Sequence, residues 1–123
     1  MKASELIAFV DAVKPNAFSY KMKISWLNEV EGMVWTDIML RHPASFVSYK
    51  VDEDVELSTK PPHAKIYSTY LSAMIDYHNG EYDKYETTKA LFNECFGNYM
   101  RWYANEFSPA DNLEESETEY VNI

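Results

Sequence analysis

Apolar residues recur at helical spacing in four stretches of the chain, and this pattern predicts four helices. In the first stretch, residues 4–13, Leu6 and Val10 lie one helical turn apart. Ser4 is expected to cap this helix at its N-terminus. Pro15 is expected to end it, because proline disfavours the helical conformation at the residue before it. We therefore expect a short first helix that stops at a turn.

The second stretch predicts a longer helix, from about Tyr20 to Leu40, with Ser19 as its cap. The apolar stripe that we expect to face the core consists of Leu27, Val30, Val34 and Ile38. The side that we expect to face solvent carries Lys21, Lys23, Asn28, Glu31 and Asp37. His42 and Pro43 should stop this helix.

Two further helices are predicted in the second half of the chain. Pro61 and Pro62 suit the first turn of the third helix. Its apolar stripe is formed by Ile66, Tyr70, Met74 and Tyr77, with Tyr67 and Leu71 beside it. An Asn-Gly pair should end it, and the fourth helix follows at once, from about Glu81 to Phe107. So short a connection makes neighbouring helices antiparallel, and we expect a helix hairpin.

The fourth predicted helix has an apolar face that is too wide for one narrow seam. Its aromatic residues are Tyr82, Tyr85, Phe92, Phe96, Tyr99, Trp102, Tyr103 and Phe107. Two explanations stay open at this point: the helix lies at the centre of the domain, or it also meets a second subunit. Trp102 is a candidate interface residue, since tryptophan is enriched in the cores of protein interfaces.

Residues 44–60 follow a different pattern, with a period of two. Val47, Tyr49 and Val51 alternate with polar residues, which is typical of extended chain. We predict a short extended loop or a β-hairpin insertion at about 44–60. A single hairpin is marginally stable alone and must lean on another surface. These three residues are therefore candidates for an assembly interface.

Residues 108–123 form an acidic tail, which we expect to be flexible in isolation. Its acids are Asp111, Glu114, Glu115, Glu117 and Glu119, and it has no base. The whole chain has 20 acids and 11 bases, so the tail holds more than half of the net charge of −9. Its β-prone end, which starts at Tyr120, is suited to add a strand to a partner. The domain itself is expected to span residues 1–107.

The composition places the chain among soluble domains of the all-α class, as a small bundle of about four helices. Only three glycines occur among 123 residues, which argues against a turn-rich β fold and a phosphate-binding loop. The net charge of −9 argues against specific nucleic-acid binding, which uses clustered bases. No apolar run approaches the ~18 residues of a membrane span, and we expect no membrane association.

No motif in the chain indicates catalysis or metal binding. The single Cys95 excludes an intrachain disulfide and makes a cysteine-based zinc site implausible. A Cys95–His nucleophile pair is conceivable. However, Cys95 falls in the apolar stripe of the fourth helix, where a free cysteine usually behaves as a small hydrophobe. We therefore expect no enzyme, no catalytic or metal-binding residue and no cofactor.

Several segments resemble the head–tail connector, or adaptor, proteins of tailed bacteriophages and prophages. Together they cover most of residues 10–105. The segments that carry the resemblance are VDAVKPN at 10–16, ISWLNEVEG at 24–32, PPHAKIY at 61–67, YLSAMIDYHNGEYDKY at 70–85 and ALFN at 90–93.

The resemblance implies a virion structural protein of the DNA-packaging and head–tail module. It would form a homo-oligomeric ring that docks under the portal and forms part of the channel through which DNA leaves the head. The partners would then be portal and tail-side phage proteins, with DNA passing through the ring. The protein would reside in the virion, and in the bacterial host cytoplasm before assembly. Such subunits use an extended loop and a C-terminal tail to engage neighbours, and here 44–60 and 108–123 are the candidates. The alternative is a phage assembly chaperone or another small helical protein–protein interaction module.

Overall fold

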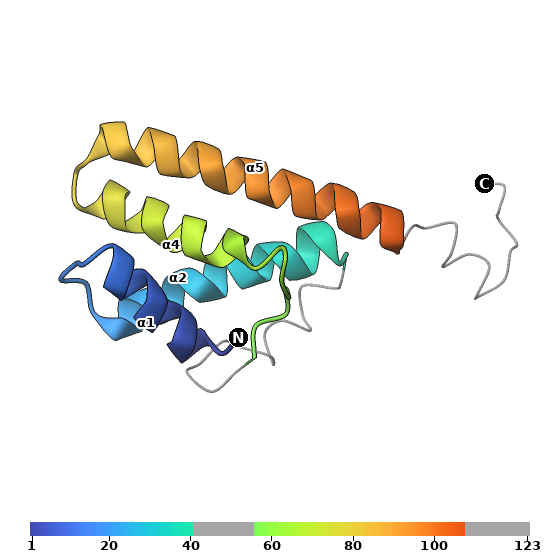
Figure 1. The fold of residues 1–123 in the computed structure, drawn as a ribbon, viewed down its shortest axis with the longest axis horizontal. Coiled ribbons are helices and arrows are strands. Elements are labelled where there is room, and N and C mark those ends of the chain that lie inside the picture. The colour runs from blue at the N-terminus through green and yellow to red at the C-terminus, as the bar shows by residue number, and fades with distance from the viewer. Residues whose placement is uncertain (41–55, 108–123) are drawn as a thin grey trace, which may run out of the picture.

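The fold is all-α, as predicted, and Figure 1 shows it in a computed structural model that describes residues 1–40 and 56–107. The helical elements of these ranges are α1 (Ala3–Val13), α2 (Tyr20–Met33), the π-helix η1 (Val34–Ile38), α4 (Lys65–His78) and α5 (Tyr82–Glu106). Within the same ranges the only β pairing is a single antiparallel bridge between Lys2 and Glu56. The prediction of about four helices is confirmed.

Helices α4 and α5 form the predicted antiparallel hairpin. Gly80 makes the turn between them with a φ of 77°, a conformation that glycine adopts without steric cost. The backbone N–H of Glu81 closes the turn by donating to the carbonyl of Asp76, at 2.9 Å. Gly80, two residues after the last residue of α4, therefore determines where this helix ends.

Helix α4, and not α5, is the central helix of the bundle. It packs against α5 on one side and against α1 and α2 on the other (Figure 1). Only Phe92 and Tyr99 of α5 are buried. The suggestion that the wide apolar face of α5 reflects a central position is therefore wrong. Part of that face lies on the surface of the protein.

The core draws apolar side chains from every helix of the described ranges. The predicted stripe of Leu27, Val30, Val34 and Ile38 is buried throughout, although Val34 and Ile38 lie in the π-helix η1 and not in one continuous α-helix. On α4 the prediction was less accurate, because Tyr77 is 46% exposed. The buried residues of α4 instead surround the helix: Ile66, Tyr67, Leu71, Ala73, Ile75 and Asp76. This distribution follows from its central position, since two layers cover it.

Two of the four predicted helix starts differ from the structure. Ser19 caps α2 as expected, because its Oγ accepts from the backbone N–H of Met22 at 3.1 Å. In contrast, α1 begins at Ala3, and the residue before it donates its N–H to the Glu5 carboxylate. Ser4 is therefore not the cap. Helix α4 begins at Lys65, after the proline pair, because the preceding segment is held by other contacts described below.

Several predictions concern residues outside the described ranges. These are the interface candidates Val47, Tyr49, Val51 and Tyr120, most of the 44–60 loop and the 108–123 tail. The described end of the loop, from Glu56 onward, runs beside the N-terminus. There Leu57 is buried, and its N–H donates to the carbonyl of Met1 at 3.1 Å.

Candidate interaction surface

A buried carboxylate on α2 holds the segment that leads into α4. Glu31 is 0% exposed, although its position in the helical pattern predicted a solvent-facing side chain. Its Oε1 accepts from the hydroxyl of Tyr67 at 2.6 Å. Its Oε2 accepts from the backbone N–H and the Oγ of Ser58, at 2.8 and 2.5 Å. Glu31 therefore joins α2, α4 and the chain around Ser58.

Tyr67 completes this network. Its hydroxyl oxygen also accepts from the backbone N–H of Thr59, at 2.8 Å. Burial, and then the negative charge and hydrogen bond of Glu31, raise the pKa of Tyr67 far above its ordinary value. The phenol therefore keeps its proton in the folded protein and acts as a donor to the carboxylate.

We expect Tyr67→Phe to lower the free energy of unfolding by about 1–3 kcal/mol at pH 7, because two buried polar groups lose a partner. The loss should shrink above pH ~10. There the unfolded wild-type tyrosine releases its proton while the folded one keeps it. Wild-type stability then falls by up to about 1.4 kcal/mol per pH unit, and the phenylalanine variant lacks this term.

Urea unfolding of both proteins at neutral pH and above pH ~10 measures this difference. Tyr82→Phe is the control, because Tyr82 is exposed and should show little change at either pH. A Tyr67→Phe loss that stays constant across the two conditions would contradict the proton linkage.

Two ion pairs, in addition to the Glu31 network, hold α1 against the rest of the bundle. Lys23, also predicted to face solvent, is buried, and its Nζ lies 2.7 Å from the Oδ1 of Asp11. The Nζ of Lys14 lies 2.8 Å from the Oδ1 of the buried Asp76, which also accepts from Thr88 at 3.1 Å. These contacts join α1 to α2, α4 and α5, and each charged group is paired as burial requires.

The end of η1 and the last turns of α5 enclose an apolar hollow of about 470 Å³. We call it the Leu40 hollow, and it is lined by Asp37, Ile38, Met39, Leu40, Met100, Tyr103, Ala104 and Phe107. Leu40 is 75% exposed and Phe107 is 51% exposed. The chain continues from these two residues into 41–55 and 108–123. The last described residues before the two assembly candidates of the sequence therefore lie at one apolar surface.

A second depression lies beside α5 on the side of Trp102, and we call it the His63 groove. One part, of about 210 Å³, is lined by Met39, Ser58, Lys60, Pro61, Pro62, His63, Tyr99, Trp102, Tyr103 and Phe107. The other part, of about 280 Å³, is lined by Pro62, His63, Lys65, Cys95 and Asn98. The two parts share Pro62 and His63 in their linings and therefore lie next to each other.

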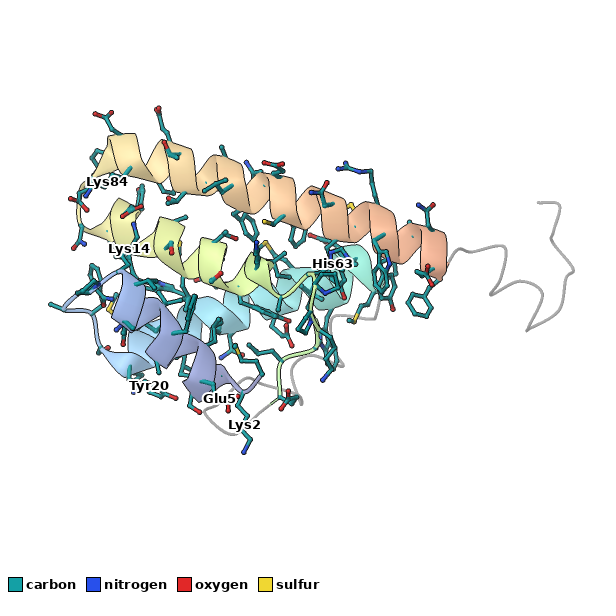
Figure 2. All side chains as sticks on the ribbon, in the orientation of Figure 1. Lys2, Glu5, Lys14, Tyr20, His63 and Lys84 are labelled. Atoms are coloured by element: carbon teal, nitrogen blue, oxygen red, sulfur yellow. The ribbon has the colours of Figure 1, made fainter. Side chains whose placement is uncertain are left out.

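Aromatic rings form the floor of the His63 groove. The ring centroid of His63 lies 5.1 Å from that of Tyr99 and 4.9 Å from that of Trp102. Tyr99 and Trp102 are nearly parallel, at 17° and 5.9 Å. Figure 2 shows His63 between the start of α4 and the C-terminal half of α5. The Glu31 network fixes the segment that precedes this histidine, because Ser58 donates to Glu31 and Thr59 donates to Tyr67. Ser58 also lines the groove.

Of the interface residues predicted from the sequence, Trp102 is described, and it is 41% exposed in this groove. Cys95 packs against the core, as expected of a small hydrophobe, and it also lines the groove with His63. No pattern in the sequence indicated that His63 or Leu40 would join these surfaces. Each is brought to α5 by a segment distant from it in the chain.

The described residues contain no group of three or more His, Cys, Asp or Glu side chains placed to hold a metal ion. Among the helices of residues 1–40 and 56–107, none has the length and hydrophobicity to span a bilayer. Comparisons with protein-family models, curated proteins and solved structures give no match to this chain. The two surfaces are therefore interpreted from their own geometry and from the sequence resemblance.

Proposed function

We propose that this chain is a non-enzymatic structural protein of a tailed-phage or prophage virion, a subunit of a head–tail connector ring under the portal. The observation that carries the proposal is the Leu40 hollow. Mainly apolar and aromatic residues line it, and they include Leu40 and Phe107, the last described residues before the ranges 41–55 and 108–123. The resemblance of most of residues 10–105 to connector proteins supports a ring under the portal as the form of this assembly.

A ring requires a heterologous contact, in which two different surfaces of the subunit meet. The described residues supply exposed apolar side chains at both ends of the elongated bundle (Figure 1). One end has the Leu40 hollow, and the other has Val13, Tyr20, Tyr77 and Tyr82 around the α1–α2 and α4–α5 connections. Tyrosine and methionine are enriched in interface cores, so these two ends are suited to meet in a head-to-tail contact.

The proposal is tested by electron microscopy and by mass measurement in solution. Both are carried out on the whole chain, alone and with the portal protein encoded in the same genome. We expect closed rings on the portal, and a mass on the portal that is a multiple of the 14.4 kDa chain. Monomers that remain unbound at every portal concentration would contradict the connector assignment. Binding of a single copy that later dissociates would instead favour the assembly-chaperone alternative.

A charge in the 44–60 segment should also block assembly. Tyr49 and Val51 lie outside the described residues, but their alternation with polar residues predicts an extended assembly loop. We expect Tyr49→Asp or Val51→Asp to leave the far-UV circular dichroism of the monomer unchanged and to abolish rings. Loss of the helical spectrum would show that these residues belong to the core.

A further inference from the structure

Among the residues of 1–40 and 56–107 that line the His63 groove there are basic groups and no carboxylate. Lys60, Lys65 and His63 line it. The guanidinium of Arg101 donates to the side chain of Asn98, which lines it too. Lys60 has an acidic neighbour in Glu56, whose Oε2 lies 3.8 Å from Lys60 Nζ and also pairs with the N-terminus. In a chain of net charge −9, this groove is therefore suited to an acidic ligand.

We propose that the His63 groove is the docking site of the chain's own acidic segment, residues 108–123. This segment has five acids and no base, which complements the lysines and the arginine. It ends in Tyr120-Val121-Asn122-Ile123, whose ring and aliphatic groups are suited to the exposed rings of the groove. It begins directly after Phe107, which itself lines the groove.

The segment is long enough for this path. From Phe107 back to Cys95 is a helical rise of about 18 Å, at about 1.5 Å per residue. Glu114 and Glu115 follow Phe107 by seven and eight residues, and at about 3.3 Å per extended residue they reach back about 23–26 Å after one reversal, past the level of Cys95. Because the segment is covalently attached, its effective concentration at the groove is in the millimolar range, and weak contacts suffice for docking.

This inference goes beyond the proposed function and does not depend on it. The groove and the Leu40 hollow share Met39, Tyr103 and Phe107. Leu40 and Met100 line the hollow but not the groove. A segment docked along Trp102 would therefore leave Leu40 and Met100 available to a neighbouring subunit.

Tryptophan fluorescence in the full-length chain reports on the groove. Trp26 and Trp35 are buried, whereas Trp102 is exposed, so quenching by acrylamide is dominated by Trp102. We expect Glu114→Gln/Glu115→Gln to lower the docking equilibrium constant about fivefold, and quenching to rise accordingly. Salt at about 1 M should raise wild-type quenching to the same level. The matched control, Asp83→Asn/Glu86→Gln, removes two exposed charges elsewhere on α5 and should quench like the wild type.

A charge exchange tests the partner residues directly. Lys60→Glu/Lys65→Glu should also raise quenching, and combining it with Glu114→Lys/Glu115→Lys should restore the protection of Trp102. Equal quenching of the wild type and the Glu114/Glu115 variant, at low and high salt, would overturn the proposal. Protection that increases with protein concentration would overturn it as well, because the segment would then come from another copy. Light scattering on the same samples reports assembly separately, so failure of either proposal is distinguishable.

Discussion

Glu31→Ala is expected to lower the free energy of unfolding by about 3–5 kcal/mol, because it removes the acceptor of a buried network. The hydroxyl of Tyr67 and the N–H of Ser58 both lose the carboxylate to which they donate. The substitution also opens a cavity at a fully buried position. Domains of this kind have total stabilities of about 5–15 kcal/mol, so the loss is a large fraction of the whole.

Urea unfolding followed by circular dichroism measures this loss. Glu86→Ala is the matched control, since Glu86 is an exposed helical glutamate and its replacement should change stability by about 0.5 kcal/mol or less. Where Glu31→Ala does not fold, Glu31→Gln is the informative variant, because its amide keeps one of the two acceptor oxygens. A loss below about 1 kcal/mol for Glu31→Ala would show that the network does not stabilise the fold as argued.

Met100→Asp is expected to abolish assembly, because it places a charge in the Leu40 hollow. Met100 is 38% exposed, so an aspartate there can stay hydrated in the monomer. In a closed ring the carboxylate would be buried against a neighbour, and an unpaired buried charge costs several kcal/mol. Every contact around the ring would carry this cost, so the loss of rings should be complete.

Leu91→Asp provides a close control for this change. Leu91 is 49% exposed on the same helix but does not line the hollow. Under conditions in which the wild type forms rings on the portal, Leu91→Asp should form them and Met100→Asp should stay monomeric by light scattering. Equal behaviour of the two variants would mean that the Leu40 hollow is not the assembly surface.

Helical periodicity predicts most of the fold correctly. The apolar stripe from Leu27 to Ile38 is buried as expected, although the 3.6-residue period of an α-helix holds only to Met33 and a π-helix follows. The hairpin follows from one local signal, the glycine at position 80 directly after a helical pattern. Both features depend on residues close together in the chain, and such features can be derived from a single sequence.

The errors arise where a residue's environment is set by distant segments. The periodic pattern treats Lys23 and Glu31 as solvent-facing because they are charged. In the structure they are buried because Asp11 and the Ser58–Tyr67 region supply their partners. Pro61 and Pro62 suit a helix start, but α4 begins only at Lys65. The preceding chain is held by a hydrogen bond from Thr59 to Tyr67. No local pattern contains this information.

The candidate site could be predicted only in part for the same reason. Trp102 was identified from its residue type and its place on a helix with too many aromatic residues, and it is indeed exposed. Leu40, in contrast, belongs to a surface with Met100 and Phe107 only because η1 packs beside the end of α5. A hollow formed by residues about sixty positions apart is a tertiary feature.

The central claim, that this chain is part of a phage particle, is tested most directly by the protein composition of purified particles. Particles induced from the host that carries this gene would be separated on a density gradient and analysed by quantitative mass spectrometry. The connector assignment predicts that the chain co-purifies with portal and tail proteins, in a fixed ratio to the portal. Its absence from mature particles, while it is abundant in the lysate, would contradict the claim.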